Sequence, residues 1–363
     1  MIYDTEQFDR LRLIRSPNIG PVTYRQLIER FGNASLAMEA LPDLVMRGGG
    51  SKTMLADPRM IEGEMKATEA AGARYLFLGS TEYPELLSHL DNAPPAIMVK
   101  GNTALLNRNP VALVGARNAS AGACRFARTL AYELGQAGFA VVSGLARGID
   151  TAAHAGSIDS GTIAVIAGGL DVAYPPENRD LQDAIAGRGL LVAEMPPGTE
   201  PRARHFPYRN RIIAGLSLGT VVVEAAPKSG SLITARLAAE AGREVMAIPG
   251  SPLDPRSHGC NQLIREGATL VQNAAEIAEL LRPMDDRVVR SATPRALTAL
   301  AINDGSDDDR DAISSLMGMT YVSVDELVRQ SGASQPVVQM VLLELELAGK
   351  LERGAGGKVR LCA

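Results

Sequence analysis

The sequence predicts a doubly wound α/β protein with a small helical domain before the sheet and a winged helix after it. Three observations support this prediction. The start of the chain has a helical pattern interrupted by a Pro/Gly turn, and the middle alternates apolar strands with amphipathic helices. The end has two helices followed by a hairpin. A length of 363 residues corresponds to about two to three domains.

The first region, 1–79, is predicted to be helical. Apolar residues such as Phe8 and Leu11 recur at helical spacing, residues 16–21 interrupt the pattern, and it resumes at Leu27. Two helices joined by a tight turn form a helix-hairpin-helix. Such a turn can present backbone N–H groups to a phosphate, but a bundle built only for packing gives the same pattern, so both interpretations stay open.

The second region, 80–283, predicts a parallel sheet covered by helices on both faces. Its apolar runs show little alternation, which is typical of strands that are buried on both sides. The strands are expected at 111–114, 140–143, 162–167, 190–193, 220–224 and 245–248. Ligands of such sheets bind beyond the carboxyl ends of the strands, near the point where the strand order reverses. The loops after these strands are therefore the candidate sites.

The third region begins with an acidic stretch, 284–309, that is expected to be a linker. Residues 310–363 predict a winged helix, in which Ser323 caps one helix, Ser334 caps a second that ends at Ala348, and a β-hairpin follows. The second helix has no Arg or Lys and is not expected to enter the major groove of DNA. Its broad apolar surface favours packing against another domain or a partner, with a self-contained domain as the alternative.

Composition and charge exclude several protein classes. The chain is 46% hydrophobic and 21% charged, which is typical of a globular protein. It has no apolar run long enough for a membrane span and no signal-peptide pattern at its start, so no membrane association and a cytoplasmic location are expected. Cys124, Cys260 and Cys362 are too far apart for a ligand pair or a disulfide framework, and neither a metal nor a cofactor is expected. The net charge is −4, but arginines gather within 108–147 and 202–211.

Two glycine-rich loops follow the first two parallel strands, and each precedes a helix. Helix N-termini attract anions, so these loops are candidate phosphate sites. The predicted contacts are Gly115, Arg117, Ser143, Gly144, Arg147 and Gly148. The pattern G-x-G-x-x-G is absent, and the second strand ends without a ribose-binding acid, which argues against NAD. For Asp150 and His154, capping and packing are favoured over acid/base catalysis.

Two more candidate sites lie farther along the chain. Residues 206–211 are expected to form a loop before a helix at 212–216, and they combine aromatic rings for base stacking with arginines for phosphates. The predicted contacts there are Phe206, Arg209, Asn210 and Arg211. After the fifth strand, a phosphate-sized turn contributes Lys228, Ser229, Gly230 and Ser231. This turn lacks the Walker pattern, and four such loops in a row fit a linear polyanion better than one phosphate.

Catalytic patterns are absent from the sequence, and the chain is not expected to be an enzyme. The four histidines lack metal-binding spacing, and Ser143 lacks the G-x-S-x-G elbow of hydrolases. Glu194 and Glu224 close two of the strands, and anchoring of loops is favoured for them over the alternative role of catalytic acid.

Long motifs in the middle region resemble the DNA-processing protein A family, also called Smf. They are GAR at 115–117, SGLARGIDTAAH at 143–154, FPYRNRIIAGL at 206–216 and APKSGSLITA at 226–235. The resemblance implies a Rossmann-like domain flanked by a SAM-like helix-hairpin-helix domain and a winged helix. It also implies a bacterial protein that binds and protects single-stranded DNA and loads the RecA recombinase in natural transformation and recombination. The family is further expected to form a homodimer through the Rossmann-like domain.

Carried over to this sequence, the basic pocket of the family corresponds to five cations: Arg117, Arg147, Arg209, Arg211 and Lys228. Two positions depart from the family pattern. Ala116 replaces a Ser or Thr, and Asn18 replaces a glycine of the hairpin turn, where Asn tolerates a left-handed backbone. The alternative is a nucleotide-processing enzyme similar to lysine-decarboxylase-like phosphoribohydrolases. The glutamate of their P-G-G-x-G-T-x-x-E motif is absent from 227–232.

Overall fold

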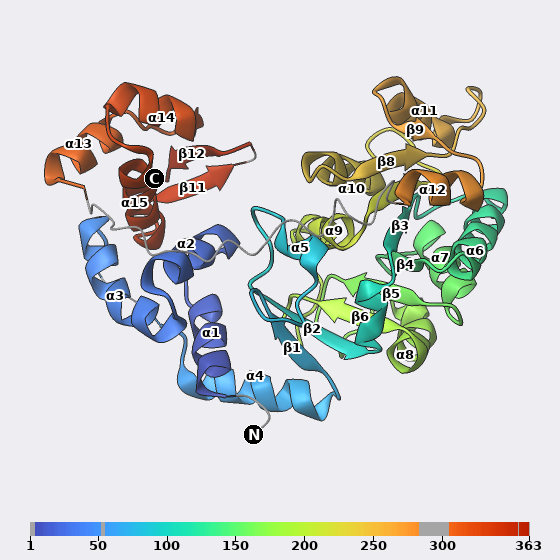
Figure 1. The fold of residues 1–363 in the computed structure, drawn as a ribbon, viewed down its shortest axis with the longest axis horizontal. Coiled ribbons are helices and arrows are strands. Elements are labelled where there is room, and N and C mark those ends of the chain that lie inside the picture. Colours follow the sequence, from blue (N-terminus) through green and yellow to red (C-terminus); the bar gives the residue numbers. More distant parts are fainter. Residues whose placement is uncertain (1–3, 52–54, 283–304, 355, 363) are drawn as a thin grey trace. The chain divides into compact units, whose positions relative to one another are not determined.

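The computed structural model describes residues 4–51, 55–282, 305–354 and 356–362. The chain divides into two compact units (Figure 1). The larger unit is Glu64–Ser291, and the smaller one combines Met1–Gly63 with Ala292–Ala363. No helix in the described ranges is both long and apolar enough to cross a membrane.

The larger unit contains a sheet of nine strands in the order β1-β2-β6-β5-β4-β3-β7-β8-β9 (Figure 1). The strands are β1 (Arg74–Phe77), β2 (Ala96–Gly101), β3 (Pro110–Val114), β4 (Ala140–Ser143), β5 (Thr162–Ile166), β6 (Leu190–Ala193), β7 (Gly219–Val222), β8 (Glu244–Ala247) and β9 (Thr269–Leu270). Strands β3 to β9 pair in parallel. The chain proceeds from β3 to β4, β5 and β6 on one side and then crosses to β7 and β8 on the other, as a doubly wound sheet requires.

Helices cover both faces of this sheet. They are α5 (Glu85–Ser88), α6 (Ala121–Gln136), α7 (Ile149–Ser157), α8 (Arg179–Arg188), α9 (His205–Leu216), α10 (Gly230–Glu240), α11 (His258–Arg265) and α12 (Ala274–Leu281). Alternate residues of β3 enter opposite cores: Val111 and Leu113 pack with α6 and α12, whereas Ala112 and Val114 pack with α9. All six predicted strands are present, and the burial of both faces of the sheet explains their continuous apolar character.

Two predictions about the sheet need correction. Strand β1 falls within 1–79, which the sequence pattern assigned to helices, and β2 was not predicted. Both pair antiparallel, β1 with β2 and β2 with β6, so one side of the sheet is not parallel. Strands of four to six residues that pair without a crossover helix lack the strand–helix alternation on which the prediction depended.

The smaller unit joins the helices at the start of the chain to the winged helix at its end. The first group comprises α1 (Thr5–Arg15), α2 (Pro21–Phe31) and α3 (Ala34–Arg47), and α4 (Pro58–Ala70) then leads into the larger unit. The second group comprises α13 (Asp307–Ser315), β10 (Val322–Ser323), α14 (Val324–Ser331), α15 (Gln335–Leu347), β11 (Leu351–Gly354) and β12 (Lys358–Leu361). Helices α1 and α2 form the predicted hairpin, with Asn18 in its turn at a φ of 63°.

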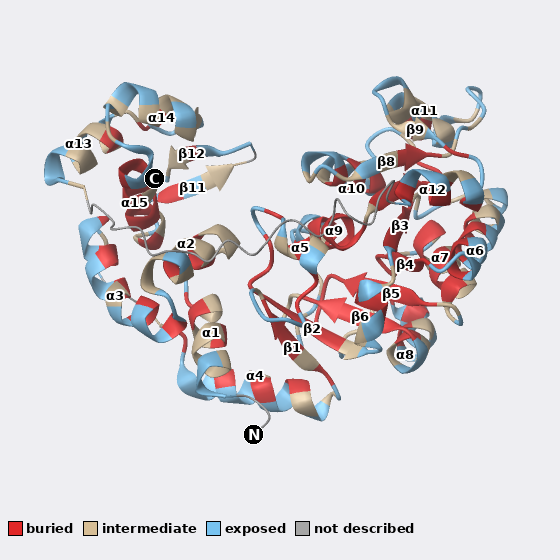
Figure 2. Ribbon diagram, viewed as in Figure 1, coloured by how far each residue is buried: buried red, intermediate tan, exposed pale blue. Residues whose placement is uncertain are grey.

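The packing of α15 confirms that the winged helix contacts another domain. Figure 2 shows α15 buried along most of its length. The predicted apolar residues, such as Val338 and Leu342, fill the core of the winged helix itself, whereas Leu343 and two neighbours pack against the N-terminal helices. Of the expected linker, residues up to 304 lie outside the described ranges, and Asp307 already begins α13.

Candidate nucleic-acid interface

A pocket of about 280 Å³ lies where β3, β4 and β5 end, next to the first turn of α9. The loops after these strands place arginines and aromatic rings around it. Its lining includes Arg117, Gly144, Arg147, Tyr174, Phe206 and Arg209. Parallel sheets present their ligand sites at this edge, and the structure brings three of the four predicted loops together here.

Two guanidinium groups flank an aromatic pair in this pocket. The Cζ atom of Arg117 lies 5.0 Å from the ring centroid of Phe206, and that of Arg209 lies 5.9 Å from the same centroid. The Tyr174 ring is 5.6 Å from Phe206. Arg117 and Tyr174 are exposed, so a planar ligand with a negative charge can reach both a ring face and a cation from solvent.

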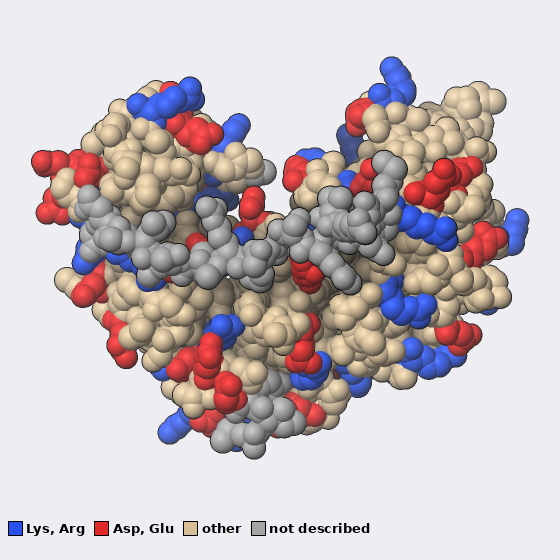
Figure 3. All heavy atoms as spheres, viewed as in Figure 1, with Lys and Arg blue, Asp and Glu red and all other residues tan. Residues whose placement is uncertain are grey.

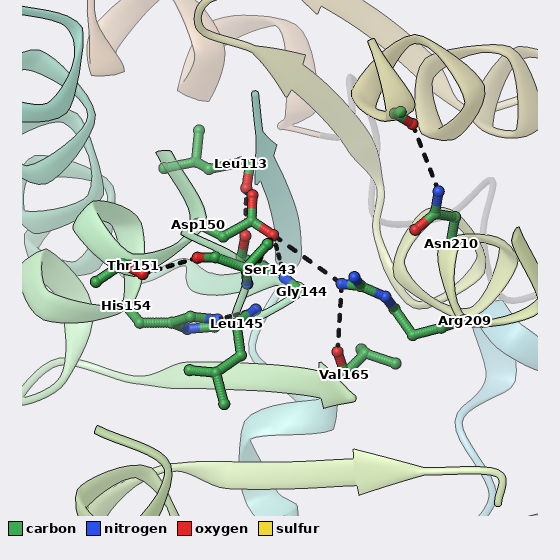
Figure 4. Close-up of polar contacts among 12 residues, drawn as sticks. Leu113, Ser143, Gly144, Leu145, Asp150, Thr151, His154, Val165, Arg209 and Asn210 are labelled. Atoms are coloured by element: carbon green, nitrogen blue, oxygen red, sulfur yellow. Dashed lines mark hydrogen bonds and ion pairs between the residues drawn. The ribbon is translucent and has the colours of Figure 1, made fainter. Parts of the chain in front are cut away.

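Arg209 lines the pocket, and Figure 4 shows the polar contacts of its guanidinium. Its side chain is 6% exposed, its Nη1 donates to the Val165 carbonyl at 3.4 Å, and this nitrogen is 4.0 Å from a carboxylate oxygen of Asp150. Its Nε has no hydrogen-bond partner among the described residues. Burial lowers the pKa of Arg209 to about 10, which keeps it charged at neutral pH. A Cβ at Gly144 would lie 1.3 Å from Nη1, so only glycine leaves room for this guanidinium.

Asp150 and His154 hold the loop beneath the pocket rather than facing it. Asp150 accepts hydrogen bonds from the backbone N–H groups of Gly144 and Ala146. His154 Nε2 accepts from the Leu145 N–H, so Nδ1 carries the proton and donates to Thr162 Oγ1 at 2.7 Å. Burial lowers the pKa of His154 to about 3, which makes it neutral at physiological pH. These contacts agree with the packing interpretation.

Residues 206–211 are not a loop, because α9 begins at His205. This corrects the predicted start of the helix at 212. The N-cap position is Arg204, whose side chain makes no capping hydrogen bond, and Pro207 lies in the first turn, where a missing N–H is tolerated. The helix therefore begins without a recognisable start signal and with a residue that usually indicates a break.

Arg211 does not line the pocket, so its predicted DNA contact lacks the geometric support that Arg117 and Arg209 have. It is 5% exposed, and its Nη2 donates to both oxygens of Glu194 at 2.6 and 2.7 Å. Its Nη1 donates to the Asn92 carbonyl at 2.6 Å. These hydrogen bonds make Arg211 and Glu194 a structural ion pair.

The N-terminus of α6 already holds an anion supplied by the protein. Glu224 accepts from the Ser120 N–H at 2.9 Å and from the Ser120 hydroxyl at 2.8 Å, and its carbonyl accepts from the Ala116 N–H. This carboxylate takes the position that the sequence suggested for a phosphate after Gly115. A Cβ at Gly115 would lie 2.5 Å from Cγ1 of Ile149, so this glycine permits close packing. Glu224 anchors the loop, as expected.

Other predicted residues of the glycine loops also have structural contacts. Ser143 is fully buried and donates to the Leu113 carbonyl at 2.6 Å, so it does not face the pocket. A Cβ at Gly148 would lie 2.3 Å from the Ala116 carbonyl oxygen, and this glycine has a φ of 74°. Arg147 is exposed and pairs with Glu177.

The turn at 228–231 lies beyond the lining of the pocket, at the end of β7 on the other side of β3. Lys228 is exposed, with a φ of 68°, and Ser229 caps α10. Asn210 connects α9 to this turn by donating to the Gly230 carbonyl at 3.5 Å (Figure 4). Tyr174 lines the pocket but was not among the predicted site residues, although its segment, YPPEN at 174–178, is one of the motifs that resemble the family.

Models of three protein domains match consecutive parts of this chain. A family model described as DNA recombination-mediator protein A matches residues 74–282, and models for a DprA-like N-terminal HHH domain and a DprA winged helix domain match 4–67 and 292–357. DNA processing protein DprA of Streptococcus pneumoniae is 48% identical over 197 residues, which cover 54% of this chain and 70% of that protein.

Two solved structures are also similar. The X-ray structure of DNA processing protein A from Streptococcus pneumoniae matches with a TM-score of 0.63 at 35% identity, covering 77% of this chain and 98% of that one. A structure of DNA processing protein A from Helicobacter pylori, described by its single-stranded DNA binding mode, matches with a TM-score of 0.52 at 30% identity, covering 57% and 95%. The chain therefore belongs to the DNA recombination-mediator protein A family.

Proposed function

We propose that this chain binds single-stranded DNA by taking an unstacked base into the pocket beside α9. The main support for the proposal is that the guanidinium groups of Arg117 and Arg209 both lie near the Phe206 ring. Within the described residues, Arg117 makes no ion pair, so its charge is available to a phosphate. Aromatic stacking and cationic contacts together are how proteins hold single strands without reading their sequence.

The shape of the site favours a single strand over a duplex. A pocket of about 280 Å³ has room for one base, and a base reaches it only when it is unstacked and unpaired. On the face drawn in Figure 3, basic and acidic side chains are interspersed. Lys228 is proposed to contact a flanking phosphate at the end of β7.

The partners of the chain are proposed from its family membership. Bound DNA is protected and passed to the RecA recombinase, and the larger unit forms a homodimer. Capture of purified RecA and stimulation of strand exchange test the first proposal, and sedimentation velocity tests the second. The chain acts without catalysis, so incubation with nucleoside monophosphates releases no base. Release of free base would favour the nucleotide-processing alternative.

Fluorescence anisotropy with a single-stranded oligonucleotide and its duplex tests the proposal directly. The single strand is expected to bind more tightly, and Phe206→Ala and Arg117→Ala are expected to weaken its binding. Tyr132→Ala and Arg236→Ala are the controls, because both residues are exposed in the larger unit and neither lines the pocket. Equal affinity for the two DNA forms, or equal effects of the test and control variants, would contradict the proposal.

A further inference from the structure

The N-terminal helices and the winged helix complete each other's packing. Met340, Leu343 and Leu347 of α15 are buried in the same hydrophobic core as Leu41 and Leu44 of α3. The remaining apolar residues of α15 fill the winged helix itself. Since α15 is apolar on two faces, it requires a partner beyond its own domain, and the helices at the other end of the chain supply it.

Polar contacts surround this apolar centre. Gln26 Nε2 donates to Gln339 Oε1 at 3.0 Å, and Arg47 of α3 lies 3.8 Å from the carboxylate of Glu344. Arg310, within the winged helix, donates to both oxygens of the same carboxylate at 2.8 and 3.0 Å. Glu344 is only 1% exposed. At Gly48, a Cβ would lie 2.1 Å from the Glu344 carbonyl oxygen, so the end of α3 approaches the backbone of α15 closely. The interface has the dense packing and satisfied polar groups of a specific contact.

The same contact occupies the surfaces through which both motifs would meet DNA. In a winged helix, the second helix of the helix-turn-helix enters the major groove, and here that helix is α15. Its Gln339, a residue type suited to base edges, is bonded to Gln26 instead. In the helix-hairpin-helix, Asn18 of the turn donates to the Leu347 carbonyl at 3.2 Å, at the end of α15.

We propose that the winged helix of this chain is a protein-binding module whose partner is the N-terminal helical bundle of the same chain. In this paired state neither the hairpin turn nor α15 contacts DNA. The inference concerns the smaller unit alone and is independent of the proposed pocket in the larger one.

Cross-linking in the full-length chain tests the proposal. In a Cys362→Ser background, which removes an exposed thiol, Gln26→Cys and Gln339→Cys are combined and treated with a short bis-maleimide. Mass spectrometry is expected to find the two positions linked within one chain, and the single variants show no such link. The affinities for single-stranded and duplex oligonucleotides are expected to stay within twofold after linking.

Three results would overturn the proposal. These are absence of the link, a link that joins two chains, and a fivefold or greater loss of affinity for either DNA after linking. The last result would mean that the N-terminal helices and the winged helix must separate before one of them can bind DNA.

A charged substitution provides a second, independent test. Leu343→Asp places a carboxylate in the shared core and is expected to increase the rate of maleimide labelling at a Gln26→Cys thiol at least tenfold. Leu36→Asp, on the exposed side of α3, is the matched control and is expected to leave that rate unchanged. An unchanged rate in the Leu343 variant would contradict the proposal. If that variant fails to fold, the cross-linking result decides.

Discussion

The pocket of the larger unit and the winged helix of the smaller unit both use arginine, but their guanidinium groups face different partners. In the pocket, Arg117 and Arg209 lie near the Phe206 ring. In the smaller unit, Arg310 and Arg353 donate to Glu344 and Glu346 at 2.8 Å. A carboxylate neutralises the cation, whereas an aromatic ring leaves its charge available to a phosphate. Arg209 also has the Asp150 carboxylate at 4.0 Å, whereas Arg117 makes no ion pair within the described residues, so Arg117 is the pocket cation whose charge is most available to a phosphate.

The same contrast occurs within α9. Arg209 lines the pocket, whereas Arg211, two residues later, donates hydrogen bonds to both carboxylate oxygens of Glu194. Both residues are arginines of the same helix, and they differ only in the part of the larger unit that each side chain faces. Four predictions test whether this contrast separates DNA binding from stability.

The largest effect is expected for Arg310→Ala, which leaves Glu344 buried without its main partner. Removing one member of a buried ion pair costs about 3–5 kcal/mol, so we expect a loss of this size in the free energy of unfolding, measured with urea. Affinity for single-stranded DNA should stay unchanged. Arg329→Ala, which removes an exposed pair with Glu326, is the control and should cost less than about 1 kcal/mol. Reduced DNA affinity in a folded Arg310 variant would contradict the distinction between DNA-binding and structural arginines.

The second effect concerns pH and the histidine below the pocket. The pKa of His154 is about 3 in the folded chain and about 6.5 when unfolded, so between these values the unfolded state binds more protons. Stability is therefore lost as the pH falls, by about 2.5 kcal/mol between pH 7 and pH 4.5.

Chemical denaturation of the wild type and of His154→Gln at both pH values measures this contribution. Asp150, whose pKa is raised by burial, titrates in both proteins, so the difference between them isolates the histidine. Equal pH dependence in the two proteins would show that the pKa of His154 is the same in the folded and unfolded states, so that this histidine would be charged under the pocket at pH 4.5.

The third effect is expected for Phe206→Ala, which removes the ring between the two cations. Loss of one base–aromatic stack costs about 1–3 kcal/mol, which corresponds to an approximately 5- to 150-fold weaker affinity for a single strand. The free energy of unfolding should change less than the free energy of DNA binding, because Phe206 is only partly buried. An affinity equal to that of the control variant Tyr132→Ala would exclude the Phe206 ring from the binding site.

The smallest effect distinguishes an unpaired arginine from a paired one. Arg117→Ala is expected to reduce the magnitude of the log–log salt dependence of single-strand binding by about 0.7, the value for one phosphate contact. Arg147→Ala should reduce it less, because Glu177 already neutralises Arg147. Titrations at four or more salt concentrations measure both slopes. Identical slopes for the two variants would show that pairing with a carboxylate does not decide which cation binds DNA.

The sequence predicted those parts of the molecule whose signals are local. The buried parallel strands, the hairpin turn at Asn18 and the helices of the winged helix all have patterns within a few residues. The short antiparallel strands β1 and β2 and the uncapped start of α9 lack such patterns. The roles of single site residues were harder to predict, because they depend on partners far away in the chain. Arg211 pairs with Glu194, and Glu224 fills the helix N-terminus that seemed open to a phosphate.

The shared core of the smaller unit has a consequence for synthesis on the ribosome. The face of α3 that includes Leu41 and Leu44 is covered by Leu343 and its neighbours on α15, roughly 300 residues later. Translation adds about 5–20 residues per second, so roughly 15–60 s pass before that cover exists. During this interval the nascent helices expose an apolar surface suited to chaperones, and a chain that stops early keeps this surface uncovered.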